Sequence, residues 1–276
     1  MVLVNGEARQ DVTVVDRGFQ YGDGLFETIE VSHGQPVFLD RHLDRLSRGC
    51  HRLLIPCPDL DLLTSEAEKL AADSVQAVLK IIVTRGPGGR GYRQPDPICP
   101  TRVVSLHPFP EHPESYQEQG ICARFCSTRL GLNPALAGLK HLNRLEQVMA
   151  RAEWGDAAIQ EGLMLDLNDH VIEGTMTNLF YIRNGSLHTS PVSTTGIAGI
   201  MREVIIELAT SSRLGVREHF FKARDLLAAE EMFVCNSIIG LWPVSQLAHQ
   251  TFAIGPVTRQ ISQWVAQYKQ QWVKQC

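Results

Sequence analysis

Residues 137–148 read Ala-Gly-Leu-Lys-His-Leu-Asn-Arg-Leu-Glu-Gln-Val, and they follow a loop-like run at residues 131–134, Gly-Leu-Asn-Pro. Apolar side chains recur here every three or four residues, which predicts an amphipathic helix. Lys140 falls at the start of this helix, where the positive end of the helix dipole disfavours a second charge and favours a nucleophilic amine. On this stretch alone, an exposed helix lysine is the simpler interpretation. The predicted core-facing stripe is Leu139, Leu142, Leu145, Met149 and Ala152.

The chain before this stretch combines hairpins with one amphipathic helix. Asn5-Gly6 and His33-Gly34 each lie between short apolar runs, as two-residue hairpin turns do. An apolar run at residues 78–85 is typical of a strand. Between the hairpins and this strand, the helical spacing of apolar residues predicts a second core-facing stripe, made of Leu39, Leu43, Leu46, Cys50 and Leu53.

The chain is predicted to form two domains. Three prolines at residues 107–113 precede a polar stretch, so we expect a smaller N-terminal α+β domain at residues 1–113 and a larger C-terminal α+β domain at residues 114–276 that carries Lys140. Strands and helices follow one another in blocks, which favours the α+β class with two mixed α/β domains. The second domain is expected to contain a strand at 121–126, a hairpin turn at Asn184-Gly185, and helices at 200–211 and 257–272.

The composition excludes several classes of protein. The chain has 276 residues, of which 44% are hydrophobic, so it can bury a sizeable core. Its net charge of -4 comes from 26 basic and 30 acidic residues without charge blocks, so nucleic acid and membrane partners are not expected. Neither a signal sequence nor an apolar stretch of about 18 residues occurs. Seven cysteines without a Cys-x-x-Cys pair favour a reducing compartment, so the expected location is cytoplasmic.

Several common catalytic signatures are missing from the sequence. The ten histidines show no His-Glu-x-x-His spacing, so no metal is expected. The glycine-rich run at residues 86–91 lacks the Gly-Lys-Ser/Thr ending of a P-loop and the spacing of a dinucleotide loop, so it predicts only a flexible loop. A Gly-x-Ser-x-Gly elbow is also missing.

Five segments in order along the chain resemble the fold-type IV pyridoxal-phosphate family. This family contains branched-chain and D-amino-acid aminotransferases and aminodeoxychorismate lyases. The resemblance spans nearly the whole chain and implies a D-amino-acid aminotransferase-like fold, pyridoxal 5'-phosphate as cofactor, and an active site between the two domains. The segments are Asp16–Glu27, His42–Leu46, Lys140–Glu146, Glu173–Phe180 and Gly199–Arg202.

The resemblance assigns the two ends of the cofactor's reactive ring. Lys140 matches the family's Schiff-base lysine, which settles the choice between a functional and a merely exposed lysine. Glu173 matches the carboxylate that keeps the pyridine nitrogen protonated, so that the ring can accept electrons when a substrate C–H bond breaks. The alternative for Glu173 is a solvent-facing strand residue, but its apolar neighbours predict a buried strand.

The phosphate of the cofactor is expected to meet several groups. Arg45 matches the family's phosphate-binding arginine. Helical periodicity alone places Arg45 opposite Leu43, on a solvated face, and the resemblance is preferred at this position. Ile200 and Met201 follow Gly199 at a predicted helix start, whose free N–H groups suit an anion. Ser237 lies at the position where members of the family use a hydroxyl group to bind the cofactor's phosphate.

Within the family, residues 85–92 and 137–148 resemble the bacterial aminodeoxychorismate lyases. The implied reaction converts 4-amino-4-deoxychorismate to 4-aminobenzoate and pyruvate for folate biosynthesis. Lys140, once released from the cofactor by the substrate amine, would take the ring proton at the carbon bearing nitrogen. A substrate with two carboxylates suits a site with several cations, and the candidate substrate-binding residues are Arg85, Arg90, Tyr92 and Arg144. The alternative for the arginines is solvated surface charge.

Two other functions remain open from the sequence. An aminotransferase of the D-amino-acid or branched-chain type shares Lys140, Glu173 and the phosphate groups. A binding protein that kept the fold and lost the chemistry is the alternative from another class. The resemblance also implies a homodimer.

Overall fold

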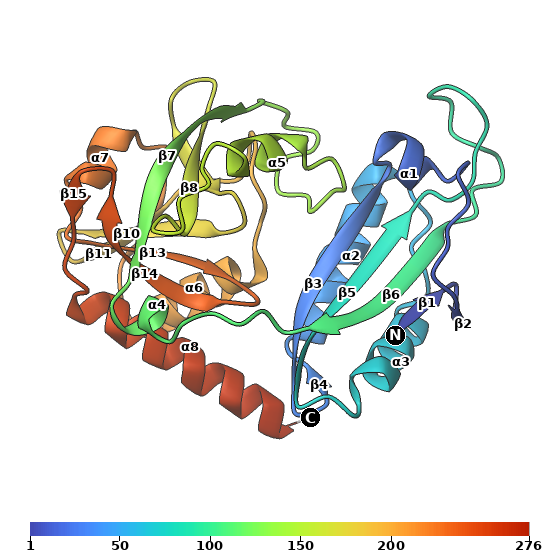
Figure 1. Cartoon of the computed structure of the whole chain (residues 1–276), viewed down its shortest axis with the longest axis horizontal. Coiled ribbons are helices and arrows are strands. Elements are labelled where there is room, and N and C mark those ends of the chain that lie inside the picture. Colours follow the sequence, from blue (N-terminus) through green and yellow to red (C-terminus); the bar gives the residue numbers. More distant parts are fainter. Residues whose placement is uncertain (276) are drawn as a thin grey trace. The chain divides into compact units, whose positions relative to one another are not determined.

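The computed structural model describes residues 1–275 and divides them into two compact units (Figure 1). The first unit comprises Met1–Pro110, the short segment Leu139–Asn143 and the end of the chain from Lys269. The second unit comprises Glu111–Gly138 and Arg144–Tyr268. Both units mix helices with strands, which confirms the expected α+β class.

The first unit is built on a six-stranded sheet with the strand order β2-β1-β6-β5-β3-β4, and every neighbouring pair is antiparallel. The long pairing of β3 with β5 extends from Gly24 opposite Thr84 to Ser32 opposite Gln76. The predicted strand at 78–85 is thus confirmed as β5. The strands are β1 (Val2–Val4), β2 (Glu7–Ala8), β3 (Gly24–Ser32), β4 (Gln35–Pro36), β5 (Gln76–Thr84) and β6 (Thr101–Pro108).

Helix α2 (Leu39–Leu53) packs against β3 and buries one face. Leu39, Leu43, Leu46 and Cys50 are buried, which confirms most of the predicted stripe. In β3, residues 25, 27, 29 and 31 are all buried, because alternate side chains of a strand point to the same face. The other helices of the unit are α1 (Arg17–Tyr21) and α3 (Leu60–Ala71).

The second unit contains a nine-stranded sheet with the order β12-β11-β10-β13-β14-β7-β8-β9, and β15 pairs with β14. A further pairing of β9 with β10 closes this sheet into a small barrel, through Glu173 opposite Asn178. The strands are β7 (Ile121–Leu130), β8 (Glu161–Asp166), β9 (Val171–Gly174), β10 (Asn178–Arg183), β11 (Ser186–Thr189), β12 (Val216–Glu218), β13 (Glu231–Asn236), β14 (Gly240–Leu247) and β15 (Gln250–Thr251).

Two of the predicted helices lie in this part of the chain with nearly their predicted bounds. Helix α6 (Ile200–Ser211) confirms the prediction for residues 200–211. Helix α8 (Pro256–Gln275) confirms the prediction for 257–272, and Ile261 and Val265 on its apolar face are buried. The shorter helices are α4 (Ser115–Glu118), α5 (Leu145–Arg151) and α7 (Ala223–Leu227).

All three predicted hairpin turns are confirmed. They join β1 to β2, β3 to β4 and β10 to β11. Asn5-Gly6, His33-Gly34 and Asn184-Gly185 each have positive φ at both positions, which a type I′ turn requires.

The helix predicted around Lys140 is wrong, because α5 begins only at Leu145. Instead, the chain from Leu139 runs extended beside β3: the Phe26 N–H donates to Lys140 O at 3.0 Å, and the Leu142 N–H donates to Gly24 O at 3.0 Å. These bonds satisfy backbone groups that a helix would otherwise have to satisfy internally. The predicted core-facing stripe is therefore wrong as well, since Leu145 and Met149 are 75% and 62% exposed.

The same pairing explains where the two units divide. The first boundary follows Pro110, close to the predicted residue 113. Because Leu139–Asn143 pairs with β3, Lys140 groups with the first unit, whereas the sequence suggested the C-terminal domain.

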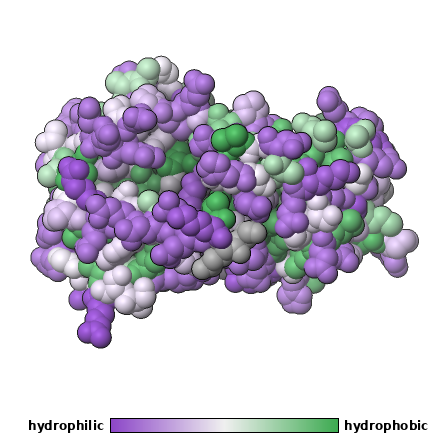
Figure 2. All heavy atoms as spheres, turned by 90° about the horizontal axis from the view of Figure 1, so that it is seen from below, coloured by the Kyte–Doolittle hydropathy of each residue, from purple (hydrophilic) through white to green (hydrophobic). Residues whose placement is uncertain are grey.

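Within residues 1–275 no helix has both the length and the apolar character to cross a membrane, and no group of three or more His, Cys, Asp and Glu side chains could hold a metal ion. The six cysteines in this range are free thiols, and Cys276 lies outside the described residues. The face drawn in Figure 2 is mainly hydrophilic, with small, scattered apolar groups.

Candidate active site

Lys140 projects from the extended segment beside β3. Its Nζ lies 4.3 Å from the ring centroid of Phe26, within the range of a cation–π contact. The side chain is half-buried. Because no helix begins at Lys140, the helix-dipole argument for a low pKa, made from the sequence, does not apply to this residue.

Arg45, the predicted phosphate-binding residue, is buried in the same unit beside Glu27. Arg45 Nε donates to Glu27 Oε1 at 2.9 Å, and Arg45 Nη2 donates to Glu27 Oε2. Only 8% of Arg45 is exposed, so the solvated position that helical periodicity predicted is wrong. The physical reason is that Glu27, on the covered face of β3, neutralises the guanidinium.

His42 completes this buried cluster. Its Nδ1 lies 2.7 Å from Glu27 Oε2. Burial by itself would raise the pKa of Glu27, but the charges and hydrogen bonds of Arg45 and His42 lower it to about 2. An ionised carboxylate only accepts, so Nδ1 of His42 carries the hydrogen. Burial, with the charges of Arg45 and Lys140, lowers the pKa of His42.

Glu27, His42 and Phe26 were not predicted as site residues from the sequence. A signal was present: Glu27 is an acidic residue within the apolar run of β3, and a buried carboxylate needs a partner. Neither the identity of that partner nor the contact between Phe26 and Lys140 follows from local spacing.

Glu173 lies in the second unit at the end of β9 and is 3% exposed. Its Oε2 accepts the Ile197 N–H at 2.8 Å. Arg144 is close enough for its charge to interact with Glu173; burial lowers the pKa of Arg144, while Glu173 and Glu146 oppose this effect. The structure therefore brings Glu173 and Arg144 into one region, and the prediction of a buried strand at Glu173 is confirmed.

The start of α6 has the features of an anion site. Gly199 is the N-cap with extended backbone (φ -70°, ψ 140°), and no side chain within residues 1–275 caps this end. The first N–H groups of a helix have no intrahelical acceptor, so those of Ile200 and Met201 suit a phosphate. A Cβ on Gly199 would lie 2.1 Å from Asn178 Oδ1, so a larger residue at this position would displace the Asn178 amide.

Ser237 follows β13 in a turn and is half-buried. Its neighbour Asn236 organises this turn: Asn236 Oδ1 accepts the N–H groups of Ile238 and Ile239 at 2.8 and 2.9 Å, and Asn236 Nδ2 donates to Met176 O at 3.1 Å. The backbone around Ser237 is thus held by side-chain hydrogen bonds.

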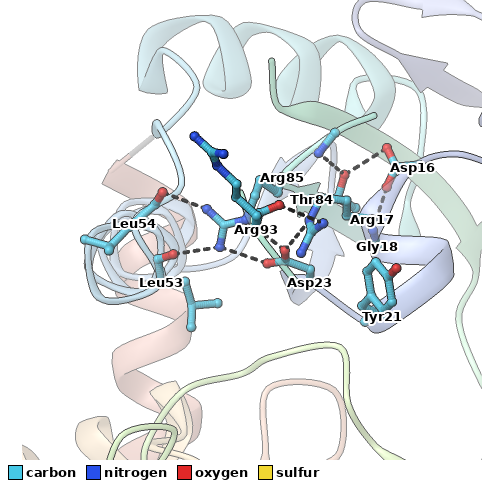
Figure 3. A network of polar contacts seen from close by, with 12 residues as sticks. Asp16, Arg17, Gly18, Tyr21, Asp23, Leu53, Leu54, Thr84, Arg85 and Arg93 are labelled. Carbon is cyan, nitrogen blue, oxygen red and sulfur yellow. Dashed lines mark hydrogen bonds and ion pairs between the residues drawn. The ribbon is translucent and has the colours of Figure 1, made fainter. Parts of the chain in front are cut away.

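Arg85, a predicted substrate residue, makes internal hydrogen bonds (Figure 3). It contacts both carboxylate oxygens of Asp23 at 2.8 and 2.9 Å, and it donates to the carbonyl oxygens of Leu53 and Leu54 at the end of α2, at 2.8 Å each. Arg17 Nε also donates to Asp23, at 2.9 Å. A substrate carboxylate could engage Arg85 fully only by breaking these bonds.

The predicted flexible loop at 86–91 is anchored to α1. Arg17 Nη1 donates to Gly91 O at 3.0 Å, and the Gly91 N–H donates to the Tyr21 hydroxyl at 3.2 Å. Tyr92 is 86% exposed and lies 5.7 Å from the Tyr21 ring, and Arg90 is exposed. The side chains of Arg90 and Tyr92 are therefore accessible, on a loop whose backbone is held in place.

The sequence profile of the family described as amino-transferase class IV matches residues 24–247. The chain belongs to the aminotransferase class IV family. The matched range contains Arg45, Lys140, Glu173, the start of α6 and Ser237.

Individual class IV proteins resemble the chain over almost its whole length. Aminodeoxychorismate lyase from Vibrio harveyi is 38% identical, covering 95% of this chain and 98% of the relative. D-alanine aminotransferase from Bacillus licheniformis is 29% identical, with 94% of each chain covered. The crystal structure of 4-amino-4-deoxychorismate lyase from Pseudomonas aeruginosa superimposes with a TM-score of 0.94 and 43% identity, covering 97% and 98% of the two chains. The expected fold-type IV architecture is thereby confirmed.

The residues of this class IV chain fit pyridoxal phosphate. Glu173 is a buried carboxylate that can face a protonated ring nitrogen, and the uncapped start of α6 can face a dianionic phosphate. Lys140 supplies the primary amine that the cofactor's aldehyde needs.

Proposed function

We propose that this protein is a pyridoxal-phosphate-dependent lyase that converts 4-amino-4-deoxychorismate to 4-aminobenzoate and pyruvate. The observation that carries the proposal is the full-length similarity to two aminodeoxychorismate lyases, at 38% and 43% identity, against 29% for a D-alanine aminotransferase. The reaction would supply 4-aminobenzoate for folate biosynthesis.

The cofactor is proposed to be held at three places. Lys140 would carry it, Glu173 would meet its ring nitrogen, and the N–H groups of Ile200 and Met201 would bind its phosphate together with Arg45 and Ser237. Bound pyridoxal phosphate supplies an electron sink for the substrate's C–H bond. Glu173 would keep a proton on the ring nitrogen, because a buried, ionised carboxylate favours the positively charged, protonated form of the nitrogen beside it.

Lys140 Nζ is proposed to act as the base and acid of the reaction. It would take the proton from the substrate carbon that bears nitrogen, and then supply a proton to the methylene carbon of the leaving enolpyruvyl group. The contact of Nζ with the Phe26 ring orients the side chain beside β3.

The substrate carries two carboxylates, and cations would recognise them. Arg144, Arg90 and Tyr92 are the proposed contacts, because Arg144 lies near Glu173 and the other two side chains are exposed on an anchored loop. Arg85 was also a candidate from the sequence. Because its guanidinium is bound to Asp23 and to the carbonyls of Leu53 and Leu54, we propose that Arg85 links these segments and does not contact the substrate.

A cytoplasmic homodimer is proposed as the working form. Support for the dimer comes from an exposed apolar face on α5, where Leu145, Val148 and Met149 are 75%, 61% and 62% exposed. Contiguous exposed apolar residues of this kind commonly mark a protein contact.

The lyase assignment is tested by giving the purified protein 4-amino-4-deoxychorismate. We expect pyruvate and 4-aminobenzoate in equal amounts, and no product from Lys140→Ala. Keto-acid-dependent amino transfer without 4-aminobenzoate would assign the protein as an aminotransferase instead.

The cofactor assignment has a separate test. Borohydride reduction followed by peptide mapping should recover the pyridoxyl group on Lys140. A protein with neither a visible cofactor band nor a reducible cofactor would be the non-catalytic binding protein of the same fold.

A further inference from the structure

Asn178 occupies a central position in the second unit and has no role in the function proposed so far. It is the first residue of β10 and is 7% exposed. On one side it pairs with Glu173, at the point where β9 meets β10 and the barrel closes. On the other side it pairs with Cys235, two residues before Ser237. Asn178 therefore lies between two groups assigned to opposite ends of the cofactor.

The side chain of Asn178 reaches a third group, the segment that leads into α6. Its Nδ2 donates to Ile197 O at 2.9 Å. The Ile197 N–H donates in turn to Glu173 Oε2 at 2.8 Å. The backbone of Ile197 is thus held on both sides. Its N–H is bound to Glu173, the residue proposed to meet the ring nitrogen, and its carbonyl is bound to Asn178.

This segment is also bound to Gly138, in the loop that precedes Lys140. The Gly138 N–H donates to Gly196 O at 2.9 Å, and the Ala198 N–H donates to Gly138 O at 3.1 Å. Gly138 precedes Lys140 by two residues in the sequence. Residues 196–198 are consequently held at Gly138, at Glu173 and at Asn178.

Gly199 adds a steric contact to these hydrogen bonds. Its position is packed so closely that an added Cβ would lie 2.1 Å from Asn178 Oδ1. The amide of Asn178 therefore both holds the Ile197 carbonyl and packs against the N-cap of α6.

We propose that Asn178 is a positioning residue that sets the distance between Glu173 and the phosphate-binding start of α6. The inference rests on the proposed function, because it assumes that one cofactor uses both groups. The pyridine ring and its phosphate have a nearly fixed separation, so the two protein groups must be held at a matching separation. Asn178 does this through Ile197 and does not itself touch the reacting atoms.

The test compares cofactor binding in Asn178→Asp and Asn178→Ala with that in a matched control, Thr189→Val. Asp keeps the shape of the side chain but, when ionised, cannot donate to the Ile197 carbonyl. Thr189, on β11, is 1% exposed, and its hydroxyl donates to Leu179 O at 2.8 Å. Leu179 follows Asn178 in β10, so Thr189→Val removes a comparable buried hydrogen bond close to Asn178. Pyridoxal phosphate is titrated into each apoprotein while the visible band is recorded, and thermal unfolding of each apoprotein is measured.

At neutral pH we expect both Asn178 variants to bind pyridoxal phosphate roughly tenfold or more weakly than wild type, the range expected for loss of one buried hydrogen bond. Thr189→Val should lower the apoprotein's unfolding temperature without this loss of affinity. Lowering the pH should reduce the difference in cofactor affinity between wild type and Asn178→Asp, because a protonated carboxyl can donate to the Ile197 carbonyl again. The difference between wild type and Asn178→Ala should not change in this way.

Two results would count against different parts of the argument. If the Asn178 variants bind the cofactor as tightly as Thr189→Val does, the positioning role is overturned while the proposed function stands. A wild-type protein that binds no pyridoxal phosphate would overturn the proposed function itself.

Discussion

Glu27 is the residue on which the buried charge cluster of Arg45 and His42 depends. It is 1% exposed, and its carboxylate accepts from Arg45 and contacts His42. Taking charged groups out of water is costly, and their mutual attraction offsets the cost only when both partners are present. The cluster is therefore sensitive to the loss of any one charge.

Glu27→Gln should lower the free energy of unfolding by about 3–5 kcal/mol, because it removes the negative charge that Arg45 and His42 contact in this buried cluster. Denaturant unfolding of the apoprotein measures this. The control is Asp44→Asn on α2, the helix that carries Arg45. The side chains of Asp44 and its ion-pair partner Arg48 are 64% and 58% exposed, so this pair should contribute less than about 1 kcal/mol. Equal effects of the two substitutions would show that the Glu27 cluster does not stabilise the fold.

The pH dependence of stability follows from the same carboxylate. The pKa of Glu27 falls from an ordinary 4.5 to about 2 in the folded chain, so its ionised form stabilises the fold. This contribution is fully present above pH 4.5 and is lost as the pH falls toward 2. We expect the stability difference between wild type and Glu27→Gln to shrink over this range in denaturant titrations. A difference that stays constant down to pH 2 would contradict the assignment.

At the scale of elements, one carboxylate joins α1, α2 and β5. Asp23 accepts from both Arg17 and Arg85, while Arg85 also binds the carbonyls at the end of α2 (Figure 3). Burial would raise the pKa of Asp23, but the hydrogen bonds from Arg85 and Arg17 lower it. Because Arg17 also holds Gly91, the loop after β5 depends on this network.

Asp23→Asn should release that loop, because two buried guanidinium groups would then share a neutral partner. We expect limited proteolysis to cleave residues 86–95 at least several times faster than in wild type. Asp11→Asn is the control, since its bond to Arg9 lies between exposed side chains. Unchanged cleavage of Asp23→Asn would show that the loop is held by other contacts.

At the scale of the whole molecule, the exposed apolar face of α5 bears on assembly. Leu145, Val148 and Met149 would be expensive to leave in water on a monomer. Sedimentation equilibrium should give twice the mass of one chain at micromolar concentration, and Met149→Glu should shift the equilibrium toward the monomer. A wild-type protein that sediments as a monomer would rule out the dimer.

Much of the fold could be predicted from local sequence. The turns at Asn5-Gly6, His33-Gly34 and Asn184-Gly185, the helices at 200–211 and 257–272, and the strand at 78–85 all follow from turn chemistry and apolar spacing. These signals are carried by residues close together in the chain. The ordered motifs likewise identified the family and its cofactor from the sequence.

Only the tertiary structure decided the surroundings of the key side chains. Apolar spacing put Lys140 on a helix, but pairing with β3 makes its segment extended. Helical periodicity alone indicated a solvent-exposed Arg45, but Arg45 is buried and forms an ion pair with Glu27, which lies on another element. Arg85 binds Asp23, and Asn178 reaches Glu173 through Ile197. The physical reason is common to all: local spacing reports only on neighbouring residues, whereas the pairing partner that fixes each side chain's surroundings comes from a distant part of the chain.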